Sequence, residues 1–428
     1  MSLCIPDTST IVCNPTNPLE TSKTNALTQT IELIRLSPEL SFTIDVSGKG
    51  HSSYLVCMFL SSLYDLLSYT GSNLAELTLK NFVFDYTQFK TLIKCLCLIN
   101  TSVISLNISN FVLYSSLGAQ TNYQSFDIIG NIIRCNKTLT SLTWLNTFPS
   151  DTIVDETNEI VLALCIANTT LQYLNLSNLT FTYSSIAAIL DQNSTLQSLS
   201  VRNTDTWDNL SESLLSTDES SDLSDTENDF ESEDPFQTFC YSLANNTSLT
   251  ELNLNGSSID QEEPLFLIAL QTNITLRCLS FNFTPYPPGL VIFDSIFFAS
   301  LSNLVDLKIS SGSPQRCRPA DFCTFLNTNT SLTSLSIPLK FIPDTYIFGN
   351  VLYDSEPITC PDIVYNTFDR SPTMHYLNLK TECGTLNPDN LSKINKKKAH
   401  NQKMKNLLLI DFLLEIIPPF KFGKTLSA

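Results

Sequence analysis

One short motif, L-x-x-L-x-L, recurs along most of this sequence at intervals of about 28 residues. Between Leu249 and Leu332, successive copies begin 27, 28 and 28 residues apart. Self-similarity with such a period is typical of proteins whose repeats stack on their neighbours. The copies begin at Leu74, Val103, Leu139, Leu171, Leu196, Leu249, Leu276, Leu304, Leu332 and Met374, and a poorer copy lies near Leu40.

Each motif is followed by a helical pattern and then by an asparagine. The alternating L-x-L part suits a short strand with its apolar side chains on one face. Helical periodicity is clear in 160–168, 183–193, 236–245 and 264–273. Asparagine tolerates the left-handed conformation and hydrogen-bonds nearby backbone, so we expect it to end each helix. These asparagines precede a strand in the pattern Asn-x-Thr/Ser at Asn100, Asn136, Asn168, Asn193, Asn246, Asn273 and Asn329.

A single strand–helix unit has two apolar faces and cannot bury both by itself. Stacking gives each strand a parallel partner and each helix a neighbour to pack against. Because helices are wider than strands, the stack should curve with the strands inside. The sequence therefore predicts an α/β solenoid, a horseshoe with an inner parallel sheet and outer helices.

Segments such as ANTTLQYLNLSNLTF and NNTSLTELNLNGSSI resemble leucine-rich repeats of the ribonuclease-inhibitor-like type. The resemblance covers about residues 30–415. It implies the horseshoe fold and protein–protein recognition in general, without naming a partner. The family usually has Asn or Cys at the ninth position of the repeat. Here an asparagine stands one place earlier, and we expect it to bond the loops of the first half, with less regular loops in the second half. These asparagines are Asn81, Asn110, Asn146, Asn178 and Asn203.

The predicted organisation has three parts. Residues 1–30 form an N-terminal polar segment, residues 31–390 form the solenoid, and residues 391–428 form a C-terminal capping helix and tail. Solenoids need such an end unit to cover the last core face. Residues 205–234 interrupt the solenoid as an acidic insertion, which we expect to be disordered because it has few apolar residues and high charge.

The net charge of −18 argues against nucleic acid as a partner, because phosphate binding needs a basic surface. Most of the acidity is local, since residues 205–234 hold twelve carboxylates and no Lys or Arg. Within them Ser216, Ser224 and Thr226 each have a carboxylate three residues later, as acidophilic kinases prefer. Phosphorylation at these three residues is a hypothesis, and a solvated spacer is the simpler interpretation.

The thirteen cysteines and three histidines show no metal-ligand spacing, so we expect no metal or cofactor and interpret the cysteines as reduced thiols. The chain shows neither a secretory signal nor an apolar run long enough for a membrane span. We therefore expect an intracellular protein, cytoplasmic or nuclear, that is monomeric. The six lysines between Lys393 and Lys405 leave open a nuclear import or anionic-surface signal beside the capping role.

Positions three, five and seven of each strand are predicted to face the concave side of the horseshoe. Serine, threonine or asparagine fills 18 of these thirty places. Interface hot spots are rich in Tyr and Arg, so Tyr173 and Arg202 are the first candidates for partner contact, followed by Glu251 and Tyr376. A purely structural role for the stacked hydroxyls and amides is an equal alternative.

No phosphate-binding, nucleophile-elbow or zinc-protease motif occurs, so we expect a non-catalytic scaffold that binds a protein partner. One alternative is a GTPase-activating protein, because one family with this repeat type also carries an acidic stretch; GTP hydrolysis assays with Arg202→Ala would test it. Another alternative is the substrate-recognition subunit of a ubiquitin ligase, although residues 1–39 show no adaptor motif.

Overall fold

The computed structural model divides the chain into two compact units. The first unit comprises residues 1–259 and 263–282, and the second comprises residues 260–262 and 283–428. The structure describes residues 10–12, 40–45, 74–81, 83–98, 102–114, 124–146, 158–203, 234–259, 264–283, 292–293, 295–311, 315–341, 362–371, 373–379, 392–393, 395–400 and 403. The predicted phosphorylation sites and all of the acidic insertion except Asp234 lie outside these residues.

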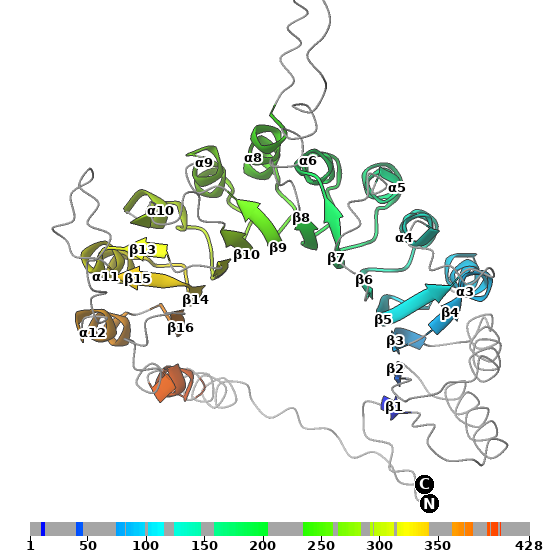
Figure 1. Ribbon diagram of the computed structural model, residues 1–428, viewed down its shortest axis with the longest axis horizontal. Coiled ribbons are helices and arrows are strands. Elements are labelled where there is room, and N and C mark those ends of the chain that lie inside the picture. Colours follow the sequence, from blue (N-terminus) through cyan, green and yellow to red (C-terminus); the bar gives the residue numbers. More distant parts are fainter. Residues whose placement is uncertain are drawn as a thin grey trace, which may run out of the picture. The chain divides into compact units, whose positions relative to one another are not determined.

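The first unit is built on an open parallel sheet whose main strands follow one another in chain order (Figure 1). The poorer copy of the motif near Leu40 is confirmed as a strand, whereas no sequence pattern indicates the first strand. The strands are β1 (Thr10–Val12), β2 (Leu40–Asp45), β3 (Leu74–Lys80), β5 (Ser105–Tyr114), β6 (Ser141–Asn146), β7 (Tyr173–Phe181), β8 (Ser198–Asn203), β9 (Glu251–Ile259) and β10 (Cys278–Phe283).

The leucines of the motif form the core behind this sheet. The fourth residues of successive repeats pair in one register and are at most 1% exposed: Leu77, Leu106, Leu142, Leu174, Leu199 and Leu252. Burying one such side chain contributes about 1.5–3 kcal/mol. A slip of one residue would turn every leucine toward solvent, so the apolar pattern itself fixes the register.

Six helices of the described part of the first unit lie on one side of its sheet (Figure 1). They are α3 (Tyr86–Leu98), α4 (Gln124–Cys135), α5 (Asn158–Leu162), α6 (Tyr183–Gln192), α8 (Pro235–Asn245) and α9 (Pro264–Thr272). Helix α5 continues as a π-helical turn, Ala163–Ala167. The four helical stretches predicted from the sequence are thus confirmed. Helix α8 begins directly after the acidic insertion, where the Asp234 side chain accepts a hydrogen bond of 3.0 Å from the Phe236 backbone N–H.

The second unit repeats this plan with an additional layer. Strands β12 (Asp306–Ser311), β14 (Ser334–Ile337) and β16 (Tyr376–Leu379) are parallel, with Leu307, Leu335 and Leu377 in one register. The helices are α10 (Ser295–Ser300), α11 (Pro319–Thr328) and α12 (Asp362–Arg370). A second parallel sheet is formed by β11 (Ile292–Phe293), β13 (Gln315–Cys317) and β15 (Leu339–Phe341).

The loops after the main strands differ between the units, but not in the predicted way. In the first unit Asn81 and Asn110 adopt left-handed backbone conformations, with φ of 60° and 53°. The Asn81 N–H donates to Ser109 O at 3.1 Å, and the short strand β4 (Val83–Asp85) pairs with the end of β5. The expectation of less regular loops in the second half is wrong, because three of those loops form the sheet β11–β13–β15.

Candidate functional site

The exposed face of the first unit's sheet carries the third residue of each repeat in one transverse row. The strand register pairs Ser141 with Tyr173, Tyr173 with Ser198, and Ser198 with Glu251. Neighbouring strands lie about 4.8 Å apart, so Tyr173 and Glu251 flank Ser198 at a separation of about 10 Å. The Tyr173 side chain is 45% exposed and Glu251 is also exposed. Two of the predicted contact residues therefore share one accessible row.

Tyr173 is held loosely in this row. Its hydroxyl donates to Gln197 Oε1 at 3.4 Å, at the long end of the hydrogen-bond range. The ring therefore presents an apolar surface with a polar tip, the combination that makes tyrosine common among interface hot spots.

The structure does not bring Arg202 next to Tyr173. Arg202 lies on the adjacent strand but four residues beyond Ser198, which is the partner of Tyr173. Four strand residues span about 13 Å, so the two side chains start from opposite ends of their strands. Arg202 is half-buried, and its Nε is covered without a hydrogen-bond partner.

The fifth residues of the repeats form a second transverse row on the same face. Their register pairs Asn107 with Thr143, Thr143 with Asn175, and Asn175 with Ser200. These side chains are half-buried or buried, and the covered atoms Asn107 Oδ1 and Ser200 Oγ lack hydrogen-bond partners. Side-chain hydrogen bonds therefore do not link the residues of this second row continuously from strand to strand.

The remaining candidate, Tyr376, belongs to the second unit. It pairs with Ser334, which in turn pairs with Asp306, and its side chain is 46% exposed. Two residues further along these strands, Asn378 Nδ2 donates to Ser336 Oγ at 3.2 Å. The second unit thus has its own tyrosine-bearing row.

The asparagines that precede the strands are structural residues, and they do not adopt the predicted left-handed conformation. Asn168 and Asn193 have extended backbones, with φ of −97° and ψ of 127° and 115°. In each case Oδ1 accepts hydrogen bonds from the N–H groups two and three residues later. For Asn273 these donors are Thr275 N at 2.9 Å and Leu276 N at 2.6 Å. The side chain, and not a change of backbone handedness, carries the chain from helix to strand.

Five of these asparagines also join neighbouring repeats through Nδ2, which donates at 2.6–2.8 Å to a carbonyl near the end of the helix of the preceding repeat. The hydroxyl two residues later reaches back as well: Thr195 Oγ1 donates to Leu171 O at 3.2 Å, and Thr275 Oγ1 donates to Asn246 O at 3.1 Å. The Nδ2 bonds are Asn136 to Leu96 O, Asn168 to Ile133 O, Asn193 to Leu164 O, Asn246 to Leu190 O, and Asn273 to Leu243 O.

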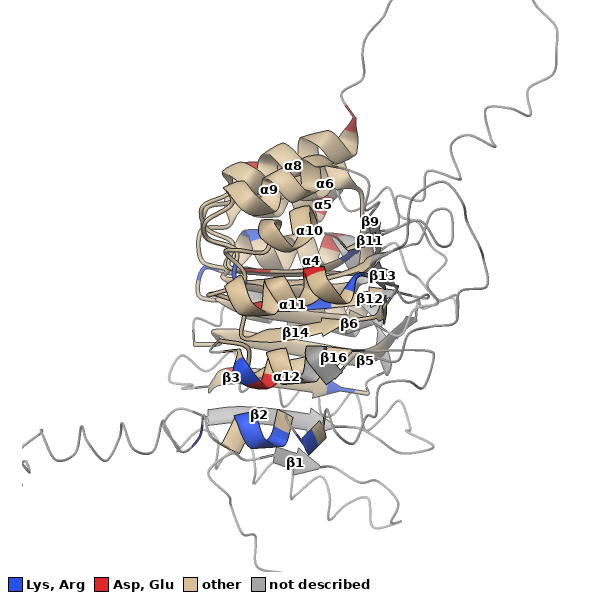
Figure 2. Cartoon of the chain, turned by 90° about the vertical axis from the view of Figure 1, so that its left-hand side faces the viewer, with Lys and Arg blue, Asp and Glu red and all other residues tan. Residues whose placement is uncertain are grey.

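The outer helices of the first unit carry exposed apolar residues at matching places. Leu162, Tyr241 and Ile268 are 46%, 55% and 52% exposed on α5, α8 and α9. Charged side chains are rare on this layer, as the tan helices of Figure 2 show. The repeat pattern alone does not single out these residues.

The sequence also gives no sign that two residues of the basic C-terminal segment make structural contacts. Asn395 and Lys398 bond the backbone of β16 and the end of α12, and Lys398 is only 9% exposed. In the sequence they look like ordinary members of a lysine-rich run, so only their contacts distinguish them.

Titratable groups offer no reactive constellation in the described part of the chain. There, no three His, Cys, Asp or Glu side chains are grouped as metal ligands. The described cysteines are free thiols, with Cys240, Cys317 and Cys323 buried and Cys135 exposed. Burial raises the pKa of the Cys165 thiol, and the charge of Asp191 adds to the shift. The Cys165 thiol donates to Ala188 O at 3.4 Å, so it is a protonated packing group.

No family model matches this chain, and no curated protein matches it. Among the described residues, no helix combines the length and apolar character that crossing a bilayer requires.

Proposed function

We propose that the chain is a leucine-rich-repeat solenoid of the ribonuclease-inhibitor-like type that serves as a non-catalytic scaffold for a protein partner. The repeated strand–helix unit with a constant leucine register supports the fold assignment. The predicted horseshoe, a monomeric state and an intracellular location, cytoplasmic or nuclear, belong to the same proposal.

The observation that carries the binding role is the row Tyr173–Ser198–Glu251. It combines an exposed aromatic side chain, a small residue and an exposed carboxylate at directly paired positions of three neighbouring strands. A partner with a small apolar protrusion beside a basic group would fit this row. Contacts of that kind concentrate binding energy in few residues.

Site-specific photocrosslinking tests the proposal. A photoreactive amino acid replaces Tyr173 in one variant and Tyr241, on the outer face of α8, in a matched control. We expect a discrete adduct with one protein from position 173 and none with that protein from position 241. Mass spectrometry identifies the adduct.

The dissociation constant of the purified complex then shows how much the Tyr173–Ser198–Glu251 row contributes to binding. Glu251→Lys reverses the charge beside Tyr173 and should weaken binding at least tenfold, whereas Tyr241→Ala should leave the dissociation constant unchanged. Equal loss from both variants, or adducts from position 241 alone, would reject the sheet face as the binding surface.

A further inference from the structure

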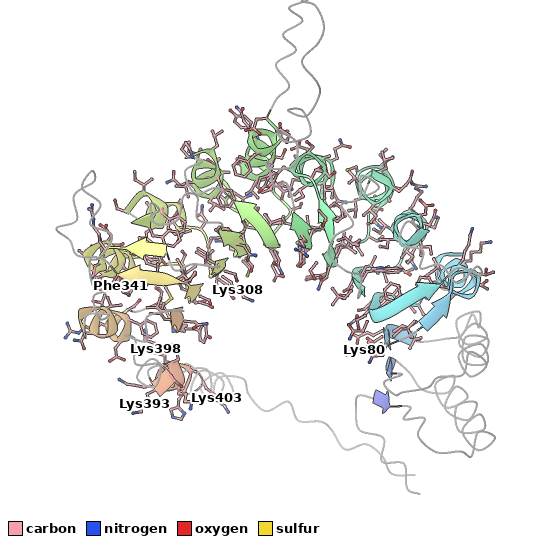
Figure 3. All side chains as sticks on the ribbon, viewed as in Figure 1. Lys80, Lys308, Phe341, Lys393, Lys398 and Lys403 are labelled. Atoms are coloured by element: carbon pink, nitrogen blue, oxygen red, sulfur yellow. The ribbon has the colours of Figure 1, made fainter. Side chains whose placement is uncertain are left out.

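The last strand of the second unit, β16, is followed by residues that bond its backbone. Residues 392–393, 395–400 and 403 are helical, and Figure 3 shows Lys398 on the side of this segment nearer α12 and β16, with Lys393 and Lys403 turned away. Lys398 Nζ donates to Phe368 O, to Met374 O at 2.6 Å and to Ser371 O at 3.4 Å. One ammonium therefore satisfies three backbone carbonyls.

These three carbonyls are the ones that a following repeat would bond. In three repeats, the asparagine Nδ2 of the next repeat bonds the carbonyl three residues before the preceding asparagine, as Asn273 does to Leu243 O. For Asn136 and Asn193 the acceptor lies four residues before it. Ser371 occupies the asparagine position of the last repeat, so Phe368 O is the corresponding group. The hydroxyl of the next repeat bonds either the carbonyl of the asparagine position or that of the first motif residue. In the last repeat these are Ser371 O and Met374 O.

Asn395 makes the corresponding contacts with the strand β16 itself. Its Nδ2 donates to Leu377 O at 2.7 Å, and its Oδ1 accepts from Leu377 N at 3.0 Å. Leu377 is the fourth residue of the motif, and its backbone N–H and C=O point along the sheet toward the place of a further strand. One side-chain amide thus supplies both bonds that a neighbouring strand would make there.

We infer that residues 392–403 act as a built-in substitute for one further repeat, in which Asn395 replaces the strand and Lys398 replaces the Asn-x-Thr side chains. The segment thereby closes the β16 edge, a site whose chemistry fits an extended Asn-x-Ser/Thr-Leu peptide. Unprotected edges pair with other strands.

The surroundings of Lys398 fit a residue held in place by the fold. Its Nζ lies 3.9 Å from the centroid of the Phe368 ring. Cations are also favoured near the C-terminal end of a helix, and Phe368 O lies in the last turn of α12. Lys397, by contrast, points outward and pairs with Asp369 at 3.3 Å, with both side chains largely exposed. Only one of the two adjacent lysines belongs to the substitute repeat.

Amide hydrogen exchange of the full chain tests the inference. Lys398→Met keeps the aliphatic stem but removes all three donors, and Asn395→Leu removes both amide bonds. We expect at least tenfold faster exchange of the Leu377 N–H in each variant. Lys396→Met and Lys403→Met, at exposed positions of the same segment, are the matched controls and should leave this exchange rate unchanged.

A replacement variant guards against general unfolding of the altered chains. In it, a copy of residues 329–337 takes the place of residues 392–400 and supplies a true Asn-x-Ser-Leu repeat start. Slow exchange at Leu377 should then be retained, because the copied strand pairs with β16. Unchanged exchange in both single variants, or loss of protection in the replacement variant, would overturn the inference. Because the readout involves no partner protein, the result is independent of the proposed binding function.

Discussion

The repeats of the first unit and the last repeats of the second unit solve the same junction in different ways. In the first unit the buried side chain of Asn273 makes at least five hydrogen bonds, three to the start of its own strand and two to the preceding repeat. In the second unit the corresponding positions hold the apolar Leu301, then Asn329, whose Oδ1 accepts from Ser331 N and Leu332 N, and then Ser371, whose hydroxyl accepts a 3.3 Å bond from Met374 N. Two of these three junctions therefore lack the asparagine.

Both units also contain clusters of packed aromatic rings. In the second unit, Phe298 contacts four other phenylalanines and stacks on Phe325 at 4.6 Å between ring centroids. In a repeat array, stability is approximately the sum of the repeats and their nearest-neighbour interfaces. An interface can therefore be made by a directional amide or by ring area, and each kind should respond to different substitutions.

The largest effect is expected from Phe298→Ala. Removing a ring that is 4% exposed leaves a cavity among four aromatic neighbours and should lower the free energy of unfolding by about 4 kcal/mol. Urea denaturation measures the change. Ile296→Ala, on the same helix but 63% exposed, is the control and should cost less than about 1 kcal/mol. Similar costs for both substitutions would show that the aromatic cluster does not hold the second unit together.

Asn273→Ala tests the polar junction of the first unit. Losing the hydrogen bonds of a side chain that is 1% exposed leaves buried carbonyls and N–H groups unpaired and should cost about 3 kcal/mol. Faster hydrogen exchange at Thr275 and Leu276 should accompany the loss. Gln192→Ala, at the exposed end of α6, serves as the control. A cost below about 1 kcal/mol would show that stacking does not depend on the asparagine row.

Ser371→Ala should have a smaller effect. It removes one long hydrogen bond at the equivalent position, and we expect a cost of about 0.5–1 kcal/mol. The free energy of unfolding of the second unit, followed by hydrogen exchange at Met374, provides the measurement. A cost equal to that of Asn273→Ala would remove the proposed difference between the two junctions.

The last prediction concerns the pH dependence of the free energy of unfolding. Burial lowers the pKa of Lys398 from 10.5 to about 8, which outweighs the opposite influence of Asp369, and the charge of Lys397 lowers it further. Because the folded chain then releases this proton more readily than the unfolded chain, the group's contribution to stability rises as pH increases from about 8 to 10.5. Comparing wild type with Lys398→Met over this range isolates the contribution, and NMR of labelled lysine side chains locates the pKa. An ordinary lysine pKa, or equal pH slopes, would contradict this prediction.

Much of the fold follows from the sequence because the dominant contribution is periodic. Leu77 and Leu252 are separated by five repeats, yet the same spacing rule predicts that both are buried. Apolar periodicity also predicts four of the helices, because it identifies an amphipathic segment. The sequence patterns did not single out α3, α4, α10, α11 and α12. The strand β1 was not, because three residues provide too short a pattern.

The site was less predictable because it depends on where strands begin relative to one another. Sequence distance suggested that Tyr173 and Arg202 belong together, whereas the register pairs the Tyr173 row with Glu251. The left-handed conformation expected for the asparagines that precede the strands was also wrong. Asparagine adopts a left-handed turn at Asn81 but an extended conformation with side-chain hydrogen bonds at Asn193, and composition alone does not separate the two roles. Lys398 differs from Lys397 only in what it contacts.

The buried asparagine row has a consequence for sugar attachment. Each of its members is followed two residues later by serine or threonine, the acceptor pattern for an N-linked oligosaccharide. The sugar would be joined at Nδ2, the atom that Asn273 uses to hold Leu243 O while only 1% exposed. A glycan added there before folding would occupy the space between two coils, and a coil that has already stacked hides its acceptor. At these positions, glycosylation and the native stack exclude one another.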